Sequence, residues 1–320
     1  MLTMFALIFL VLFGSSPSQA VSASSTATQV VYAGTLLAEP GQQPLSGATM
    51  VISGGSIDRI EQGFPSLQTL GLAANTRLID LRDQFVMPGF IDLHVHLDAP
   101  QQGNRRHLMV RKPDAYFVLI GADNARQTLL AGFTTVRDLG SSGSAIFALR
   151  DAIADGLVPG PRLLVAGSAI TPSGGHADTH GYREEVLDAL PAAGVCNGAD
   201  DCSRAVREAV RHGADVIKVT ATGGVLSATN AGTGPQFTQA ELDAIVETAH
   251  MLGRKVTAHA HDKPGIDAAP RAGFDSIEHA MWADEDSMAL FRKTGAWLVP
   301  TIYPITWVGD TPEKMRAGPM

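Results

Sequence analysis

Residues 89–98 read GFIDLHVHLD, an apolar run that ends on two histidines one residue apart. The run predicts a buried strand, and side chains two positions apart on a strand project from the same face. His94 and His96 therefore point the same way at the end of this strand. Two imidazoles placed in this way either bind a ligand together or crowd each other without benefit, and an isolated pair does not decide between these interpretations.

From Phe90 onward, strand-like segments alternate with helical ones. The strand-like segments are FIDLHVH, FTTVRDLG, PRLLVAGSAI, ADVIKVTATGG, KVTAHAH, SIEHA and WLVPTIY. This alternation predicts an α/β fold, a (β/α)8 TIM-type barrel over residues 88–320, since no GxGxxG loop follows the first strand as a doubly wound sheet would require. The sequence ends at Met320, soon after WLVPTIY, so we expect the eighth strand to be missing and the barrel to be truncated at its C-terminus.

Two shorter regions precede the predicted barrel. Residues 1–20 contain an apolar run followed by SSPSQA, which is typical of a secretory signal peptide cut after Ala20 or Ala23. We therefore expect a secreted or periplasmic protein with no stable membrane partner after cleavage. No Lys or Arg precedes the apolar run, so a membrane-tethered N-terminus is the second interpretation. Residues 21–87, rich in Val, Ile and Thr with Gly and Pro breaks, predict the N-terminal part of a small β-sandwich domain.

The composition of the 320-residue chain excludes some classes of protein. Hydrophobic residues make up 45% and charged residues 18%, with 33 glycines, which suits an α/β enzyme better than a coiled coil or a disordered chain. With a formal net charge of −8 and no Lys/Arg-rich run, nothing in the sequence attracts nucleic acid. A homo-oligomer is compatible with the sequence. Cys196 and Cys202 predict a disulfide in an exported protein, and two unrelated thiols are the alternative.

Residues suited to metal binding gather at the ends of the predicted strands. The C-terminal ends of parallel strands in a barrel form one face, where active sites lie. The residues at these ends are His94 and His96, Arg137 and Asp138, Lys218, His259 and His261, and His279. This convergence favours a metal site over a chance pair of histidines.

Lys218 interrupts a Val/Ile run in ADVIKVTATGG. A lysine that faces the interior of a barrel is costly unless it is neutralised or paired. One interpretation is a strand-end lysine whose ammonium group reaches the solvent at the rim. We favour a lysine carboxylated by CO2, which turns a cation into a bidentate ligand able to bridge two metal ions.

These motifs together resemble the amidohydrolase superfamily. The resemblance is carried by PGFIDLHVH, GFTTVRDLG, the single lysine of VIKV, VTAHAH and SIEHA. It is narrowed to the secreted branch of imidazolonepropionase-like amidohydrolases and Xaa-Pro dipeptidases by TPSGGHAD, KVTATGGVLS and the N-terminal apolar segment. Some ochratoxin-degrading amidases are similar to this branch too. The resemblance spans residues 29–320.

The resemblance implies a centre of two divalent metal ions. The implied ligands, with carboxylated Lys218 as the bridge, are His94, His96, Lys218, His259 and His279. Which histidine of VTAHAH binds metal stays open: we favour His259 and give His261 a supporting or substrate-binding role. Zinc suits imidazole and carboxylate ligands best, and manganese is compatible with them.

The implied activity is hydrolysis of an amide bond in dipeptides or N-acyl amino acids by a hydroxide that bridges the two ions. One alternative is a mononuclear cyclic-amide hydrolase or deaminase of the same superfamily, which generally lacks the bridging lysine. Another is a catalytically impaired or non-catalytic metal-binding protein. Similar superfamily members carry an aspartate at the end of the eighth strand, and TPEKMRAGPM offers none, so we expect poor catalysis from the chain as given.

Loop and strand-end residues supply the candidate substrate contacts. His176 lies in the Gly-rich loop after the third strand, where it either contacts a substrate carboxylate or carbonyl or is merely solvated. His180 and Tyr182 are secondary candidates in the same loop. Arg137 either binds a substrate carboxylate or pairs with Asp138 to brace the strand end.

Overall fold

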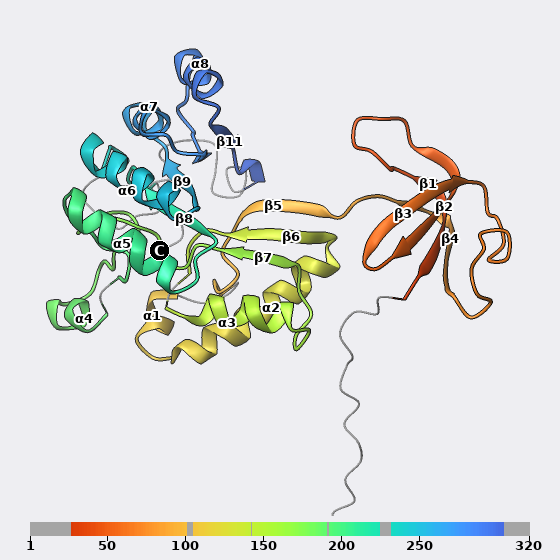
Figure 1. Cartoon of the computed structure of the whole chain (residues 1–320). Coiled ribbons are helices and arrows are strands. Elements are labelled where there is room, and N and C mark those ends of the chain that lie inside the picture. The colour runs from red at the N-terminus through yellow and green to blue at the C-terminus, as the bar shows by residue number, and fades with distance from the viewer. Residues whose placement is uncertain (1–26, 101–104, 142, 191, 225–231, 304–320) are drawn as a thin grey trace, which may run out of the picture. The chain divides into compact units, whose positions relative to one another are not determined.

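The computed structural model describes residues 27–100, 105–141, 143–190, 192–224 and 232–303. These residues belong to two compact units that divide between Pro88 and Gly89 (Figure 1). The predicted signal peptide over residues 1–20 and the segment after Tyr303 lie outside the described residues. Among the described helices, none is both long enough and apolar enough to cross a membrane.

The N-terminal unit contains a four-stranded sheet. Its strands are β1 (Gln29–Leu36), β2 (Leu45–Ser53), β3 (Ser56–Gln62) and β4 (Arg77–Val86). They lie in the order β3-β2-β1-β4, with β1 antiparallel to β2 and parallel to β4. Val30, Tyr32 and Val51 pack against Leu70 of the connection between β3 and β4. A β-sandwich needs a second sheet, and residues 27–88 form one sheet only, so the sandwich stays a prediction.

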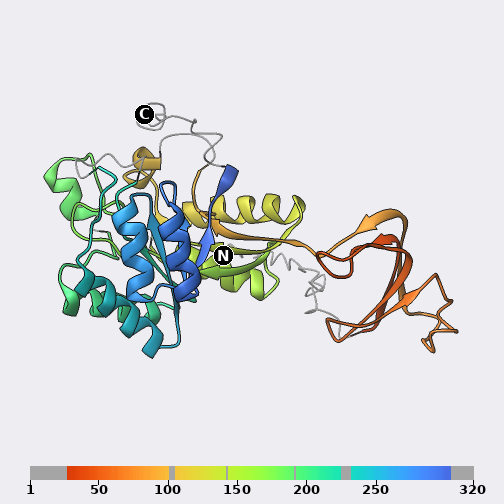
Figure 2. The same ribbon diagram turned by 90° about the horizontal axis from the view of Figure 1, so that it is seen from above.

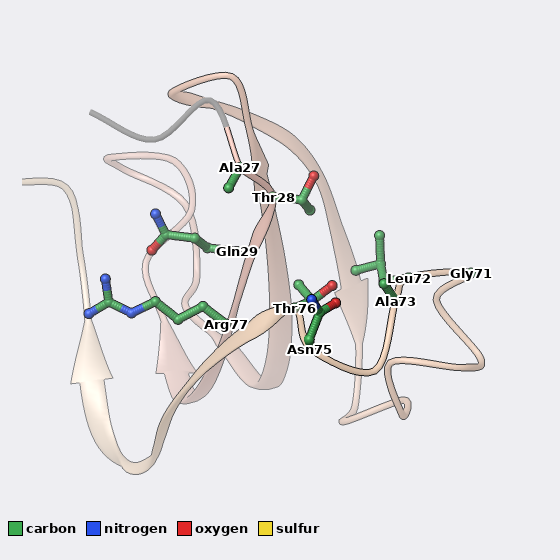
Figure 3. Close-up of a pocket in the computed structure, with 9 residues that line it drawn as sticks. All are labelled: Ala27, Thr28, Gln29, Gly71, Leu72, Ala73, Asn75, Thr76 and Arg77. Carbon is green, nitrogen blue, oxygen red and sulfur yellow. The ribbon is translucent and has the colours of Figure 1, made fainter. Parts of the chain in front are cut away.

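A hollow of about 550 Å³ lies in this unit near the starts of β1 and β4 (Figure 3). Its lining includes Thr28, Gln29, Asn75, Thr76 and Arg77. Among the nine residues that line the hollow, Arg77 alone has a charged side chain. The hollow therefore lacks the paired ionisable groups that acid–base or metal chemistry requires.

The second unit alternates strands with helices along the chain. Its strands are β5 (Phe90–Val95), β6 (Phe133–Asp138), β7 (Arg162–Val165), β8 (Val216–Thr220), β9 (Lys255–Ala260), β10 (Ser276–His279) and β11 (Trp297–Val299). Its helices are α1 (Arg105–Met109), α2 (Asp114–Leu130), α3 (Ala145–Ala154), α4 (Glu184–Ala189), α5 (Ala199–Arg211), α6 (Gln239–Met251), α7 (Lys263–Ala272) and α8 (Glu285–Thr294). Each segment that the sequence predicted as a strand thus contains one.

The strands pair in parallel with their neighbours in the chain. One sheet has the order β5-β6-β7 and the other the order β8-β9-β10-β11. A parallel bridge between Ile170 and Val219 joins the segment after β7 to β8. No ladder joins β5 to β11 among the described residues, so the structure confirms the parallel β/α order of the predicted barrel but shows no closed barrel. Closure requires further pairing between these two edges.

Helices pack along the strands and bury one side of each sheet. Figures 1 and 2 show α2 and α3 beside the first sheet and α6 and α7 beside the second. Ile217, Val219 and Ile277 of the second sheet lie in one buried cluster with Leu242 of α6 and Ile266 of α7. This packing fixes the strands from one side, so that their C-terminal ends can present polar side chains at the edge of the sheet.

Cys196 and Cys202 form a disulfide, as the sequence predicted for an exported protein, and the alternative of two unrelated thiols is wrong. Both residues are fully buried. The bridge ties the first turn of α5 to a segment whose Cys196 amide donates to the Thr171 carbonyl (3.0 Å). The disulfide and this hydrogen bond therefore hold the start of α5 close to the segment that follows β7.

Replacing both cysteines with serine should lower the free energy of unfolding by about 2 kcal/mol, because the unfolded chain regains the entropy of a short closed loop. Urea unfolding of the double variant and of the wild type, each with and without a reducing agent, measures the difference. Reduction should affect the wild type alone. Equal unfolding midpoints for the wild type and the double variant would contradict this prediction.

Candidate metal centre

The C-terminal ends of β5, β8, β9 and β10 bring histidines and a lysine together. Parallel strands that are neighbours end at the same edge, so residues far apart in the sequence become neighbours there. The residues gathered in this histidine cluster are His94, His96, Lys218, His259, His261 and His279, with His176 added by the loop after β7.

Ring contacts connect the histidines into one continuous group. The His94 ring centroid lies 5.2 Å from that of His96 and 4.8 Å from that of His279. The His259 centroid lies 4.6 Å from that of His261 and 4.7 Å from that of His279. His261 and His279 stack at 5.0 Å. The predicted ligands of both ions thus share one site.

Three of these rings can hold one ion by themselves. Each of His259, His261 and His279 offers a nitrogen within 4.8 Å of the others. The buried Nδ1 of His261 has no hydrogen-bond partner among the described residues. A buried polar atom without a partner is costly, and a metal ion would satisfy it. The donor set therefore fits a divalent metal, and both histidines of VTAHAH remain candidate ligands.

Hydrogen bonds to the outer nitrogen orient three of the rings. Nδ1 of His96 lies 2.7 Å from the Gly140 carbonyl, which can only accept, so the proton of the neutral ring is on Nδ1 and the lone pair on Nε2. Nδ1 of His94 lies 2.9 Å from Oε2 of Glu278, and Nδ1 of His279 lies 2.7 Å from the Thr301 hydroxyl. Such bonds to the far nitrogen orient histidines that bind metal through the other one.

Lys218 lies buried on β8, with 4% of its surface exposed. Burial lowers the pKa of its ammonium group to about 8, although the carboxylate of Glu278 opposes the shift. About a tenth of the amine is then neutral at pH 7, and the neutral amine is the form that reacts with CO2. The interpretation of a rim lysine that reaches solvent is wrong, because the whole side chain is enclosed.

The buried histidines are held neutral. Burial and the positive charge of Lys218 lower the pKa of His261 to about 4 and that of His176 to about 3. Burial is also the main reason why the pKa values of His94, His259 and His279 lie well below 6.5. Neutral imidazoles are the form that binds metal ions.

His176 is part of the histidine cluster rather than a freely solvated loop residue. Its ring stacks on that of His259 at 4.2 Å, and its backbone amide donates to Oε1 of Gln236 (2.9 Å). A Cβ at Gly224 would lie 2.2 Å from His176 Cε1, so the second glycine of TATGG makes room for this ring. Nε2 of His180 donates to the Gly175 carbonyl (2.6 Å) and thereby holds the same loop, which also carries Tyr182.

Arg137 lies at the site, but its partners differ from those expected. Its Nε donates to the Leu93 carbonyl (2.7 Å) and its Nη2 to Oε1 of Glu278 (2.8 Å). The predicted pair with Asp138 is wrong, because Asp138 instead accepts from the amide of Leu97 (2.7 Å). The guanidinium is thus already neutralised by a carboxylate, and its observed role is to brace β5 against β10.

Sequence reasoning missed Glu278. Its side chain is fully buried and contacts His94, Arg137, Ser276 and Thr257. The available signal was a carboxylate inside the short buried strand SIEH, which needs a cation or several donors as partners. The next residue, His279, has a left-handed backbone (φ 68°), as has Ala280 (φ 47°).

Metal-free protein should lose stability as the pH falls from about 6.5 to about 4. The histidines have lower pKa values folded than unfolded, so below about 6.5 the unfolded chain binds more protons, which costs up to about 1.4 kcal/mol per pH unit for each histidine. Urea unfolding in a chelator at several pH values measures this slope. His261→Gln should reduce this slope, and His212→Gln, at an exposed helix end outside the histidine cluster, is the control. Unfolding midpoints independent of pH would contradict the neutral cluster.

Comparison with known proteins agrees with this geometry. The family model described as "Amidohydrolase family" matches residues 85–314. The curated ochratoxinase of Aspergillus niger is 32% identical over 305 residues, which cover 89% of this chain and 61% of that protein. A crystal structure of a Xaa-Pro dipeptidase with methionine bound in the active site is 36% identical (TM-score 0.77), covering 91% of this chain and 72% of the other.

A prolidase solved with N-methylphosphonate-L-proline is 32% identical (TM-score 0.74), covering 86% of this chain and 66% of that one. The chain thus spans about three fifths of the length of the curated ochratoxinase that it matches. These similarities extend over both units and imply a TIM-barrel-like α/β fold for the second. The chain is therefore a member of the amidohydrolase family, of the branch that contains ochratoxinase and Xaa-Pro dipeptidases.

Proposed function

We propose that the protein hydrolyses the amide bond of dipeptides or N-acyl amino acids with the help of two divalent metal ions, most simply zinc. The observation that carries the proposal is a buried lysine whose charge adds to burial in lowering the pKa values of histidines gathered at the ends of neighbouring strands. The similarity to a prolidase, a Xaa-Pro dipeptidase and ochratoxinase supports amide hydrolysis. The chain spans about three fifths of the ochratoxinase length, so this activity is a proposal.

The residues would share the two ions between them. His94 and His96 on β5 would hold one ion, and His259 with His279 would hold the other. Carboxylated Lys218 would bridge them: the neutral amine attacks CO2, loses one proton and becomes a carbamate anion. When bound, the ions lower the pKa of a water molecule and polarise the scissile carbonyl.

The chain's own residues would position the substrate. Burial lowers the pKa of His176 to about 3, so its neutral ring can donate a hydrogen bond to a substrate carbonyl or carboxylate. Its stacking on His259 holds it beside the ligand histidines. The indole of Trp282 lies 6.1 Å from the His261 ring and supplies an apolar wall at the same edge. This arrangement suits a small substrate with an amide and a carboxylate.

A centre with one ion is the second candidate. His259, His261 and His279 bring three nitrogens together without help from β5 or β8, and three histidines suffice for a single catalytic zinc. This would fit a cyclic-amide hydrolase or a deaminase. The content of metal per chain distinguishes the two candidates, since the favoured one requires two ions and the bridging lysine.

Lys218→Ala should remove one of two metal ions and lower amidase activity on the order of 10²-fold or more, because a bridging ligand is lost. Metal analysis and a dipeptide-library assay measure both effects, and short carboxylic acids should restore part of the activity. Lys255→Ala, whose side chain is 78% exposed on β9, is the matched control. Unchanged metal content and rate in Lys218→Ala would refute the bridging role.

We also propose that the protein is exported. The apolar segment before SSPSQA and the disulfide between Cys196 and Cys202 support an oxidising compartment. N-terminal sequencing of protein recovered from the medium or periplasm should find Val21 or Ser24 as the first residue. Recovery of exported material that still begins at Met1 would show that the segment is not cleaved.

A further inference from the structure

We propose that Glu278 is a positioning residue of the metal centre. It fixes His94 in the tautomer with the proton on Nδ1, so that Nε2 carries the lone pair for a metal ion. The inference deepens the proposed function and rests on it in one respect, since it assumes that His94 binds metal. The tautomer itself is a property of the protein without metal and can be measured independently.

The hydrogen bonds of Glu278 carry the assignment. Oε1 accepts from Nη2 of Arg137 (2.8 Å) and from the Ser276 hydroxyl (2.9 Å), and the Thr257 hydroxyl contacts the same oxygen. Oε2 lies 2.9 Å from Nδ1 of His94, a residue 184 positions away in the sequence. Glu278 is the ion-pair partner of Arg137, so its Oε2 is an acceptor and Nδ1 of His94 is the donor.

The surroundings make this contact rigid. The Glu278 side chain is 0% exposed, the His94 side chain 5% and the Arg137 side chain 14%, so no water competes freely for these bonds. Nε of Arg137 also donates to the carbonyl of Leu93, which precedes His94. Arg137 and Glu278 therefore hold both the backbone and the ring of the β5 end. A carboxylate on the far nitrogen also makes a histidine a stronger metal ligand.

Glu278→Gln tests the assignment at constant size. An amide has one accepting oxygen and one donating nitrogen. The amide oxygen of the variant would take the place of Oε1, among its three donors. The amide nitrogen would then take the place of Oε2 and donate to Nδ1 of His94, so Nδ1 must accept. The ring proton moves to Nε2 and blocks metal binding there. We expect zinc affinity at one of the two sites to fall by about 10- to 100-fold.

Two measurements read this effect separately from activity. Nitrogen-15 NMR of the metal-free full chain should show the His94 proton on Nδ1 in the wild type and on Nε2 in Glu278→Gln. Competition with a zinc chelator gives the affinity. Glu278→Asp keeps a carboxylate and should keep the Nδ1 proton. Asp267→Asn is the control: it makes the same chemical change at a buried carboxylate that bonds Ser287 on the helical side, and should alter neither result.

The outcomes separate the inference from the proposed function. A wild-type His94 with its proton on Nε2 overturns the inference, and this measurement needs no variant to fold. Two-ion binding in the wild type with unchanged zinc affinity in a folded Glu278→Gln overturns it as well. If the wild type binds no divalent ion, the proposed function fails, while the measured tautomer still decides what Glu278 does to His94.

Discussion

The buried ammonium group of Lys218 is the constraint on which the site depends. A cation at the end of β8, away from water, is unfavourable unless anions or a change of chemistry compensate for it. The surrounding imidazoles stay neutral mainly because they are buried, and the positive charge of Lys218 lowers their pKa further. Glu278 acts in the opposite direction and favours the charged lysine. The cluster is therefore arranged for added negative charge or for metal ligation, rather than for further protonation.

The segment between β7 and α5 connects the disulfide to this cluster. The Thr171 carbonyl accepts from the amide of Cys196, and the Thr171 hydroxyl bonds that of Thr220, two residues after Lys218 on β8 (2.9 Å). The same hydroxyl accepts from the amide of Ala177, next to His176 (3.3 Å). One threonine thus links the cystine-bound segment, the lysine strand and the histidine loop. The position of His176 over His259 depends on this short chain of bonds.

The sequence predicted much of this arrangement, because much of it follows from local patterns. The strands that carry His94, Lys218 and His259 could be read from their apolar runs, and the convergence of these residues from the geometry of parallel strands. The partners of Arg137 could not be read, since its neighbour Asp138 is an equally good acceptor on charge alone. The partner of Glu278 could not be read for a different reason: its contact with His94 joins β10 to β5, and no local spacing encodes such a pairing. Closure of the barrel and a second N-terminal sheet likewise depend on distant pairing.

The left-handed backbone at His279 explains how two consecutive residues serve the same site. On a regular strand, Glu278 and His279 would face opposite sides. His279 is the last residue of β10, and its φ of 68° departs from regular strand geometry. Its ring lies 4.8 Å from that of His94, while Glu278 bonds the same His94 ring at Nδ1. Such a backbone conformation is unfavourable for β-branched side chains and is closed to proline. Substitutions at positions 279 and 280 are therefore limited by the left-handed backbone at both residues, and at 279 also by the need for an imidazole in the cluster.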